Sequence, residues 1–248
     1  MNKYLRTHIL LEDDDFIFVN KKAGLLSIPD RFDAEKANLK TMLQNEYGEI
    51  FTVHRLDLNT SGIIVFAKNA EAHSDISTIW QENKVHKEYI AITANIPPSE
   101  TGTIEAPIRE HKTKKGTYVV SNLGKECRTD YKVLHSWENS YALLQMALHS
   151  GRTHQIRVHL AYIGCPLVVE PTYGYHSEFY LSSIKKKKVN IKKGMEERPL
   201  LSRTPLHASF LKFEIPGQDK YEVRSDYPKD IKAIKYQLDK RYGAKTNE

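Results

Sequence analysis

The feature of this sequence that most constrains its fold is the apolar run GIIVFAK at residues 62–68. A continuous apolar run of this length is typical of a strand that is covered on both faces of its sheet. Asn69 follows it as a candidate N-cap, and Ala72, Ile76, Ile79 and Trp80 then recur on one face of a helix. We therefore expect a buried strand at residues 62–68 and a helix packed on its sheet.

Strand and helix patterns alternate along the rest of the chain. Further strands are predicted within residues 9–24, 88–93, 127–134, 141–149 and 205–217. A helix capped by Thr153 is predicted from the apolar stripe of Ile156, Leu160 and Ile163, with Arg157 lying away from that stripe. Another helix is expected over residues 230–242. No linker divides the chain, so we expect one domain over residues 1–248 with a basic insertion at about 174–200.

The composition is that of a soluble globular protein. Hydrophobic residues make up 40% of the chain and charged residues 27%. The first residues contain no continuous apolar segment of the kind found in signal peptides or membrane spans, so we expect a cytoplasmic protein without a membrane anchor. The two cysteines, Cys127 and Cys165, are expected to be small buried residues and not a disulfide.

The positive charge is concentrated in one segment. The formal net charge is +6, and the stretch KKKKVNIKK at residues 185–193 holds six lysines, so the remainder of the chain is balanced. Such a run is either a solvated surface loop or a contact for an acidic partner such as a phosphate backbone. The lysines concerned are Lys185, Lys186, Lys187, Lys188, Lys192 and Lys193.

The spacing of the histidines and the absence of certain motifs disfavour several kinds of active site. His149, His154 and His159 are separated by five residues, which does not suit metal ligands on one helical face. No G-x-S-x-G elbow and no glycine-rich phosphate loop is present. What remains is Arg55 and Asp57, placed two residues apart directly before the apolar strand. By itself, such a pair is most often a surface ion pair of little energetic value.

Five ordered motifs resemble those of the RluA-type pseudouridine synthases, which isomerise uridine in ribosomal and transfer RNA. They are NKKAGLLSIP at 20–29, HRLDLNTSG at 54–62, KEYIA at 87–91, GRTHQIRVHLAYIGCPLV at 151–168 and LHA at 206–208. The resemblance covers residues 9 to 215. It implies an α+β fold with a mixed, mostly antiparallel sheet flanked by helices and loops, and a central active-site cleft.

The resemblance also implies roles for single residues. Asp57 matches the catalytic aspartate, Tyr89 the tyrosine that stacks on the target base, and Arg157 the arginine that pairs with the aspartate. Residues expected to contact the substrate are Arg55, which helps to fill the space left by the extruded nucleotide, with His54, Thr60 and Leu206. The sequence departs from the family pattern where Lys22 replaces a proline and where Val169 and Glu170 replace Gly-Asp.

The chemistry of the implied reaction suits these residue types. Moving uracil from an N-glycosidic to a C-glycosidic bond calls for one ionised carboxylate, which attacks the base or the sugar or acts through a sugar intermediate. Burial would raise the pKa of Asp57, and an arginine about 4 Å away opposes this by up to about 4 kcal/mol at an effective dielectric constant near 20. The reaction is redox-neutral, so no cofactor or metal is expected.

The expected partner is structured ribosomal or transfer RNA, and a monomer is the default. The catalytic domain is expected to begin within about the first ten residues, without the N-terminal RNA-binding module that many relatives carry. Two other functions stay open at this stage. One is a catalytically inactive RNA-binding protein of the same fold. The other is a hydrolase that uses Asp57 as acid or base, which would need a second carboxylate or a metal.

Replacing the six lysines of residues 185–193 with serine tests whether this segment contacts RNA. If all six contact phosphates of single-stranded RNA, the slope of log affinity against log salt becomes shallower by roughly 4. Filter binding at several salt concentrations measures the slope. An unchanged slope would dismiss the contact.

Overall fold

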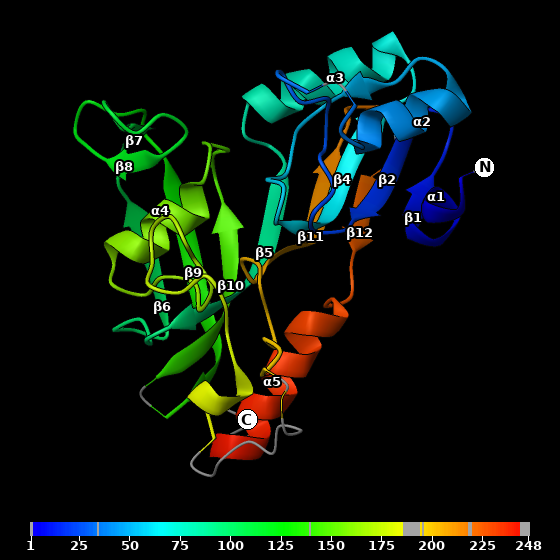
Figure 1. Ribbon diagram of the computed structural model, residues 1–248. Coiled ribbons are helices and arrows are strands. Elements are labelled where there is room, and N and C mark those ends of the chain that lie inside the picture. The colour runs from blue at the N-terminus through cyan, green and yellow to red at the C-terminus, as the bar shows by residue number, and fades with distance from the viewer. Residues whose placement is uncertain are drawn as a thin grey trace. The chain divides into compact units, whose positions relative to one another are not determined.

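The computed structural model describes residues 2–33, 35–138, 140–185, 194, 196–217 and 220–243. The chain divides into two compact units (Figure 1). Unit 1 consists of Met1–Tyr89 and His207–Asp226, and unit 2 consists of Ile90–Leu206 and Tyr227–Glu248. Each unit is therefore built from two separate stretches of sequence.

Unit 1 is a sheet with helices packed on it. Along the sheet the strands follow the order β1-β2-β4-β11, with the first part of β5 beside β11, while β12 also pairs with β11 and β3 pairs with β4. Strands β4 and β11 pair in parallel, whereas the β1–β2, β2–β4, β3–β4 and β11–β12 pairs are antiparallel. The elements are α1 (Lys3–His8), β1 (Ile9–Glu12), β2 (Phe16–Lys21), α2 (Leu39–Tyr47), β3 (Phe51–Thr52), β4 (Ser61–Ala67), α3 (Ala70–Gln81), β5 (His86–Ala94), β11 (Leu206–Glu214) and β12 (Lys220–Arg224).

Strand β4 is the centre of the unit 1 core. All seven of its residues are buried, as the apolar run predicts. Asn69 caps α3, because its side-chain oxygen accepts a hydrogen bond of 2.8 Å from the backbone N–H of Ala72. Helix α3 buries Ala72, Ile76 and Ile79 against residues of β2, β4, β11 and β12. The predicted strand and the helix that packs on its sheet are both confirmed.

Unit 2 continues β5 into a second group of strands in the order β5-β10-β9-β6. Its β6–β9 and β9–β10 pairs are antiparallel, as is the separate hairpin β7–β8. The mixed, mostly antiparallel α+β architecture is thus confirmed. The elements are β6 (Thr101–Glu105), β7 (Ile108–Glu110), β8 (Tyr118–Val120), β9 (Arg128–Trp137), β10 (Tyr141–Leu148), α4 (Gln155–Tyr162), a 3-10 turn (Leu181–Ser183) and α5 (Lys229–Tyr242).

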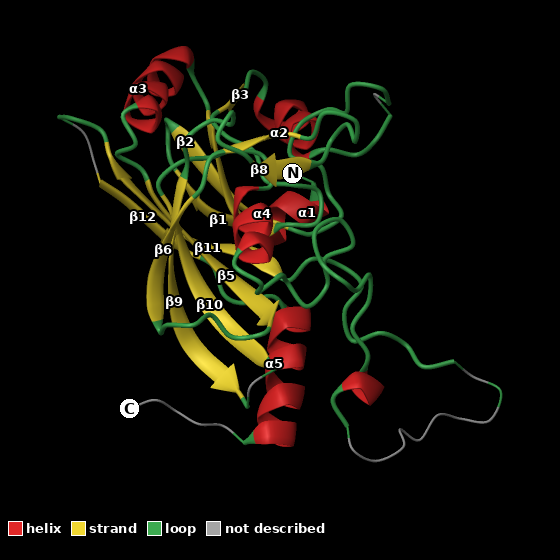
Figure 2. Cartoon of the chain, turned by 90° about the vertical axis from the view of Figure 1, so that its left-hand side faces the viewer, coloured by secondary structure: helices red, strands yellow, loops and turns green. Residues whose placement is uncertain are grey.

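Helix α5 closes the core of unit 2. Its predicted stripe of Ile231, Ile234 and Leu238 is fully buried in a cluster that includes residues of β5, β9 and β10. Figure 2 shows the helix in red. Trp137, at the end of β9, donates a hydrogen bond of 2.8 Å from Nε1 to Oδ1 of Asp239 in α5. The helical periodicity therefore correctly identified the face that packs on the sheet.

Two local features differ from the expectations. Thr153 does not cap α4: the cap position is taken by His154 in the left-handed conformation, with φ of 58°, and the helix begins at Gln155. The Gln155 side chain accepts hydrogen bonds from the Arg152 N–H and the Ser150 hydroxyl, which fixes the turn before the helix. Strands β6, β7 and β8 were not predicted, because residues 101–120 are rich in Thr, Gly and Lys and carry little apolar pattern.

Part of the segment expected as an insertion joins the unit 2 core. Phe179 and Ile184 are buried there, and Phe179 pairs with Leu201 through backbone hydrogen bonds. Of the lysine run, Lys185 is exposed, whereas Lys186, Lys187, Lys188, Lys192 and Lys193 lie outside the described residues. The buried cysteines agree with the expectation for Cys127 and Cys165. Across the described residues, the helices are all too short or too polar to cross a bilayer.

Gly62 is required where β4 approaches β11. Its φ is +113°, and a Cβ at this position would lie 2.1 Å from the backbone oxygen and 2.6 Å from the backbone nitrogen of Ala208. Gly62→Ala is therefore expected to lower the free energy of unfolding by about 2–5 kcal/mol, the sum of backbone strain and overpacking.

Gly48→Ala is the matched control in the same unit. Its φ is +80° and no atom lies within 4 Å of the added Cβ, so only a backbone cost of about 1–2 kcal/mol is expected. Urea unfolding measures both variants. Equal losses would show that the close approach of the two strands does not matter.

Candidate active site

The loop that carries Asp57 is fixed on both sides by the early loop of unit 1. Ser27 Oγ accepts a hydrogen bond of 3.0 Å from the Leu56 N–H and donates one of 2.9 Å to the Leu56 carbonyl. On the other side, the Gly24 N–H donates to the Leu58 carbonyl at 2.9 Å. The residues before and after Asp57 are thus hydrogen-bonded to one neighbouring segment, residues 24–27. These bonds restrict the backbone that carries the Asp57 carboxylate.

The ammonium group of Lys21 makes a further contact with the same loop. Its side chain is fully buried at the end of β2, and its Nζ donates hydrogen bonds to the carbonyl oxygens of Lys22 (3.1 Å), Leu25 (2.7 Å) and Leu58 (3.2 Å). A buried ammonium is tolerated when its donors are satisfied in this way. Sequence reasoning missed this role. The available signal was a lysine that ends an otherwise apolar strand.

Tyr89 lies close to Asp57 within unit 1. The tyrosine is buried near the middle of β5, and burial raises the pKa of its hydroxyl, with the negative charge of Asp57 as the second cause. Thr60 is also buried, and its N–H donates a hydrogen bond of 3.0 Å to the Asp57 carbonyl. Two of the predicted residues therefore relate to Asp57 within unit 1: Thr60 bonds to its backbone carbonyl, and Tyr89 responds to its charge.

His54 and Arg55, the two predicted residues just before Asp57 in this loop, differ in environment. The His54 ring stacks on Trp80 with centroids 4.6 Å apart, and its Nε2 accepts a hydrogen bond of 3.2 Å from the Val65 N–H. Burial, and then the positive charge of Lys87, lower the pKa of His54 to about 3, so the ring is neutral. Arg55 is exposed, and among the described residues no acceptor pairs with its guanidinium.

Arg157 lies in unit 2, where a carboxylate holds it. Its Nε and Nη2 each donate a hydrogen bond of 2.7 Å to the two carboxylate oxygens of Glu170, which is fully buried. Nη2 also contacts Thr172 Oγ1 at 3.3 Å, and the guanidinium lies 5.1 Å from the centre of the Tyr173 ring. The expectation that Arg157 lies away from the buried face is wrong, since this two-pronged pairing allows the guanidinium to be buried.

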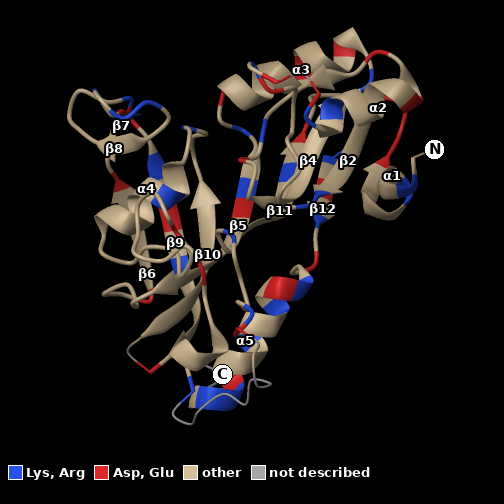
Figure 3. Cartoon of the chain, in the orientation of Figure 1, with Lys and Arg blue, Asp and Glu red and all other residues tan. Residues whose placement is uncertain are grey.

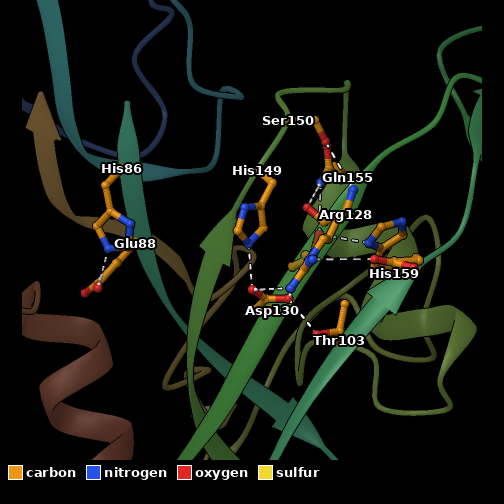
Figure 4. A network of polar contacts seen from close by, with 11 residues as sticks. His86, Glu88, Thr103, Arg128, Asp130, His149, Ser150, Gln155 and His159 are labelled. Carbon is orange, nitrogen blue, oxygen red and sulfur yellow. Dashed lines mark hydrogen bonds and ion pairs between the residues drawn. The ribbon is translucent and has the colours of Figure 1, made fainter. Parts of the chain in front are cut away.

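A further polar network connects β6, β9, β10 and α4 in unit 2 (Figure 4). Although burial opposes it, hydrogen bonds from Arg128, Thr103 and His149 lower the pKa of Asp130 to about 2. The three regularly spaced histidines bond to different partners: His149 to Asp130, His154 to Tyr173, and His159 to Thr129 and the Ala106 carbonyl. They therefore serve separate local contacts.

Comparison with known proteins decides the family. The model of the RNA pseudouridylate synthase family matches residues 15–162, which is more than half of the chain. The chain belongs to the RNA pseudouridylate synthase family. Members of this family are isomerases that convert uridine to pseudouridine in RNA, and the resemblance seen in the motifs is confirmed.

Individual relatives agree with this assignment. The chain is 31% identical to ribosomal large subunit pseudouridine synthase D of Haemophilus ducreyi, with 90% of this chain and 68% of the relative covered. It is 33% identical to the protein of the same name from Vibrio cholerae, over 98% of this chain and 74% of the relative. Among solved structures, human RNA pseudouridylate synthase domain containing 1 matches with a TM-score of 0.68 and 26% identity, covering 88% and 82% of the two chains.

The departure from the family pattern at residues 169 and 170 affects the partner of a predicted site residue, Arg157. Glu170 stands where the family usually has aspartate, and it is the residue that pairs with Arg157. Its Oε1 also accepts hydrogen bonds from the Thr172 N–H at 3.1 Å and the Tyr173 N–H at 3.4 Å. The pairing of Arg157 with Asp57 would join residues of two units and stays a prediction, as does the contact of substrate with Leu206, which is buried at the start of β11.

The neutral state of His54 predicts a loss of stability in acid. The unfolded histidine gains a proton below its ordinary pKa of 6.5, whereas the folded one stays neutral until about pH 3, so folding stability falls as the pH drops through this window. At pH 5 this amounts to about 2 kcal/mol. His54→Gln retains an acceptor for the Val65 N–H and should remove this loss.

Urea unfolding between pH 7 and pH 4 measures the effect, with the exposed His176→Gln as the control. An identical pH dependence in wild type and His54→Gln would contradict a neutral buried ring.

Proposed function

We propose that this chain isomerises uridine to pseudouridine in structured RNA and that Asp57 is its essential carboxylate. The observation that carries the proposal is the placement of this carboxylate. The backbone beside it is fixed through Ser27, Gly24 and Lys21, and its charge acts on the buried Tyr89. A fixed carboxylate next to a buried aromatic ring suits a reaction in which the base must be released, turned and rejoined without escaping.

Tyr89 would stack on the extruded uracil. Base stacking on an aromatic ring contributes about 1–3 kcal/mol, which offsets part of the few kcal/mol needed to take a base out of its stack. Arg55, exposed and directly before the Asp57 loop, would occupy the space that the base leaves, and His54 and Thr60 would border the bound nucleotide. The roles that the family resemblance implies for Leu206, in the uracil pocket, and for Arg157, as a partner of Asp57, complete the proposal.

The substrate is proposed to be ribosomal or transfer RNA. Relatives named ribosomal large subunit pseudouridine synthase D and a Vibrio vulnificus relative named dual-specificity RNA pseudouridine synthase, 34% identical to this chain, support an RNA substrate of this class. Basic residues are present in both units (Figure 3) and would contact the phosphate backbone. We further propose that the chain acts in the cytoplasm as a single catalytic domain, as a monomer and without a cofactor.

Asp57→Asn tests the central claim. Replacing the carboxylate with an amide of the same shape should leave RNA affinity within a few-fold of wild type and abolish pseudouridine formation. Forming a carbon–carbon bond at C5 of uracil displaces the hydrogen there, so the release of tritium from 5-labelled uridine in a transcript measures the reaction. Asp14→Asn removes an exposed carboxylate of unit 1 and serves as the matched control.

The other possible results distinguish the alternative functions. A wild-type protein that binds RNA but releases no tritium would be an inactive RNA-binding protein of this fold. Free uracil or cleaved RNA would indicate a hydrolase. Full activity of Asp57→Asn would remove Asp57 from the reaction. Comparing pseudouridine positions in total RNA from strains with and without this chain would then identify the target.

A further inference from the structure

Lys87 is a buried cation that the proposed reaction does not use. It lies near the start of β5, two residues before Tyr89, and only 7% of its surface is exposed. Its Nζ lies 4.9 Å from the centre of the Trp80 ring. Among the described residues, no carboxylate and no hydrogen-bond acceptor pairs with this ammonium.

Two other lysines of unit 1, Lys21 and Lys68, have ammonium groups that are matched by oxygens. The Nζ of Lys21 donates to three carbonyl oxygens, and that of Lys68 donates to Glu12 Oε1 at 3.1 Å and to the Asp13 carbonyl at 2.6 Å. Both of these ammonium groups thus donate to oxygen atoms of the protein. Lys87 is buried, like Lys21, but among the described residues no oxygen accepts a hydrogen bond from its ammonium group.

The charged and titratable groups around Lys87 do not neutralise it. Glu88, the next residue, has its side chain on the opposite face of β5 and pairs with His86 at 2.7 Å (Figure 4). His54 faces Lys87 and is neutral. Burial lowers the pKa of Lys87 to about 8, so the ammonium is still mostly protonated near neutral pH. The positive charge is therefore kept without an anion of the protein.

The position of this charge relates it to the proposed site. Lys87 and Tyr89 are two residues apart on one strand, so their side chains project from the same face about 7 Å apart along the chain. The electrostatic influence of Lys87 on His54 and that of Asp57 on Tyr89 accord with this placement. Lys87 is thus the neighbour of Tyr89 on one face of β5.

We propose that the Lys87 ammonium is an anion-binding subsite that takes a phosphodiester oxygen of the RNA strand, at a phosphate beside the uridine held at Asp57 and Tyr89. This inference rests on the proposed function. An RNA phosphate supplies the missing anion, which neither the Trp80 ring nor the neutral His54 ring provides. The contact would fix which nucleotide of the strand stands at Tyr89.

Lys87→Met tests the subsite, because methionine keeps the length of the side chain and loses the charge. Binding of a short RNA stem-loop should weaken roughly tenfold, as expected for one charge-assisted contact. The slope of log affinity against log salt should become shallower by about 0.7–0.9. The melting temperature should stay the same or rise, since an unpaired buried charge is removed. Lys87→Arg should restore most of the binding.

Two controls make the test specific. Lys84→Met removes an exposed lysine three residues earlier, which pairs with Glu82 at 2.7 Å, and should leave affinity and slope unchanged. Stem-loops that carry a single uncharged methylphosphonate at successive positions should bind wild type less tightly at one position. The same substitution at that position should not affect Lys87→Met.

The proposal is overturned if Lys87→Met binds RNA with wild-type affinity and slope, or if it melts at a lower temperature and loses binding only in proportion to its unfolded fraction. Either result would make Lys87 a structural residue. The readout is binding, so it is independent of catalysis. A wild-type protein that makes no pseudouridine but shows the methylphosphonate effect would sink the proposed function and leave the phosphate contact standing.

Discussion

The hydrogen bonds from residues 21–27 to the backbone beside Asp57 are the constraint on which the proposed site in unit 1 depends. A carboxylate on an unattached loop would sample many positions, and a reaction that must retain a released base cannot tolerate this. Ser27 and Gly24 fix the flanking residues, and the ammonium of Lys21 joins both loops through carbonyl oxygens. The early motif at residues 20–29 and the aspartate motif at residues 54–62 are thus joined by hydrogen bonds into one local structure.

Lys21 and Lys87 are two buried lysines of unit 1 whose positive charges have different surroundings. The first is matched by three carbonyl oxygens and stabilises a loop. The second lies against Trp80 without an anion, and burial lowers its pKa. An unmatched charge is costly for folding, and such costs are typically retained where a ligand supplies the missing partner. Both lysines are buried, so what distinguishes them is whether oxygen atoms of the protein accept from the ammonium group.

The sequence predicted the elements whose pattern is strong. The apolar run of β4, the cap at Asn69 and the stripe of α5 follow directly from periodicity and local hydrogen bonding. Residues 101–120 carried no such pattern, so β6, β7 and β8 were missed. For the site, motif order indicated Asp57 and Tyr89. The pairing of Arg157 with Glu170 depends on how residues 170–173 fold back onto α4, and sequence spacing does not report such a tertiary contact.

The construction of unit 1 from two distant stretches affects its synthesis on the ribosome. Strand β4 emerges early, but β11, its parallel partner, and β12 follow only after about half of the chain, residues 90–206, has been made. Until then the edge of β4 that β11 will cover has no final neighbour, and nascent apolar strands with open edges tend to associate wrongly. The order of translation therefore leaves the start of β4 without its parallel neighbour until the second stretch of unit 1 has been made.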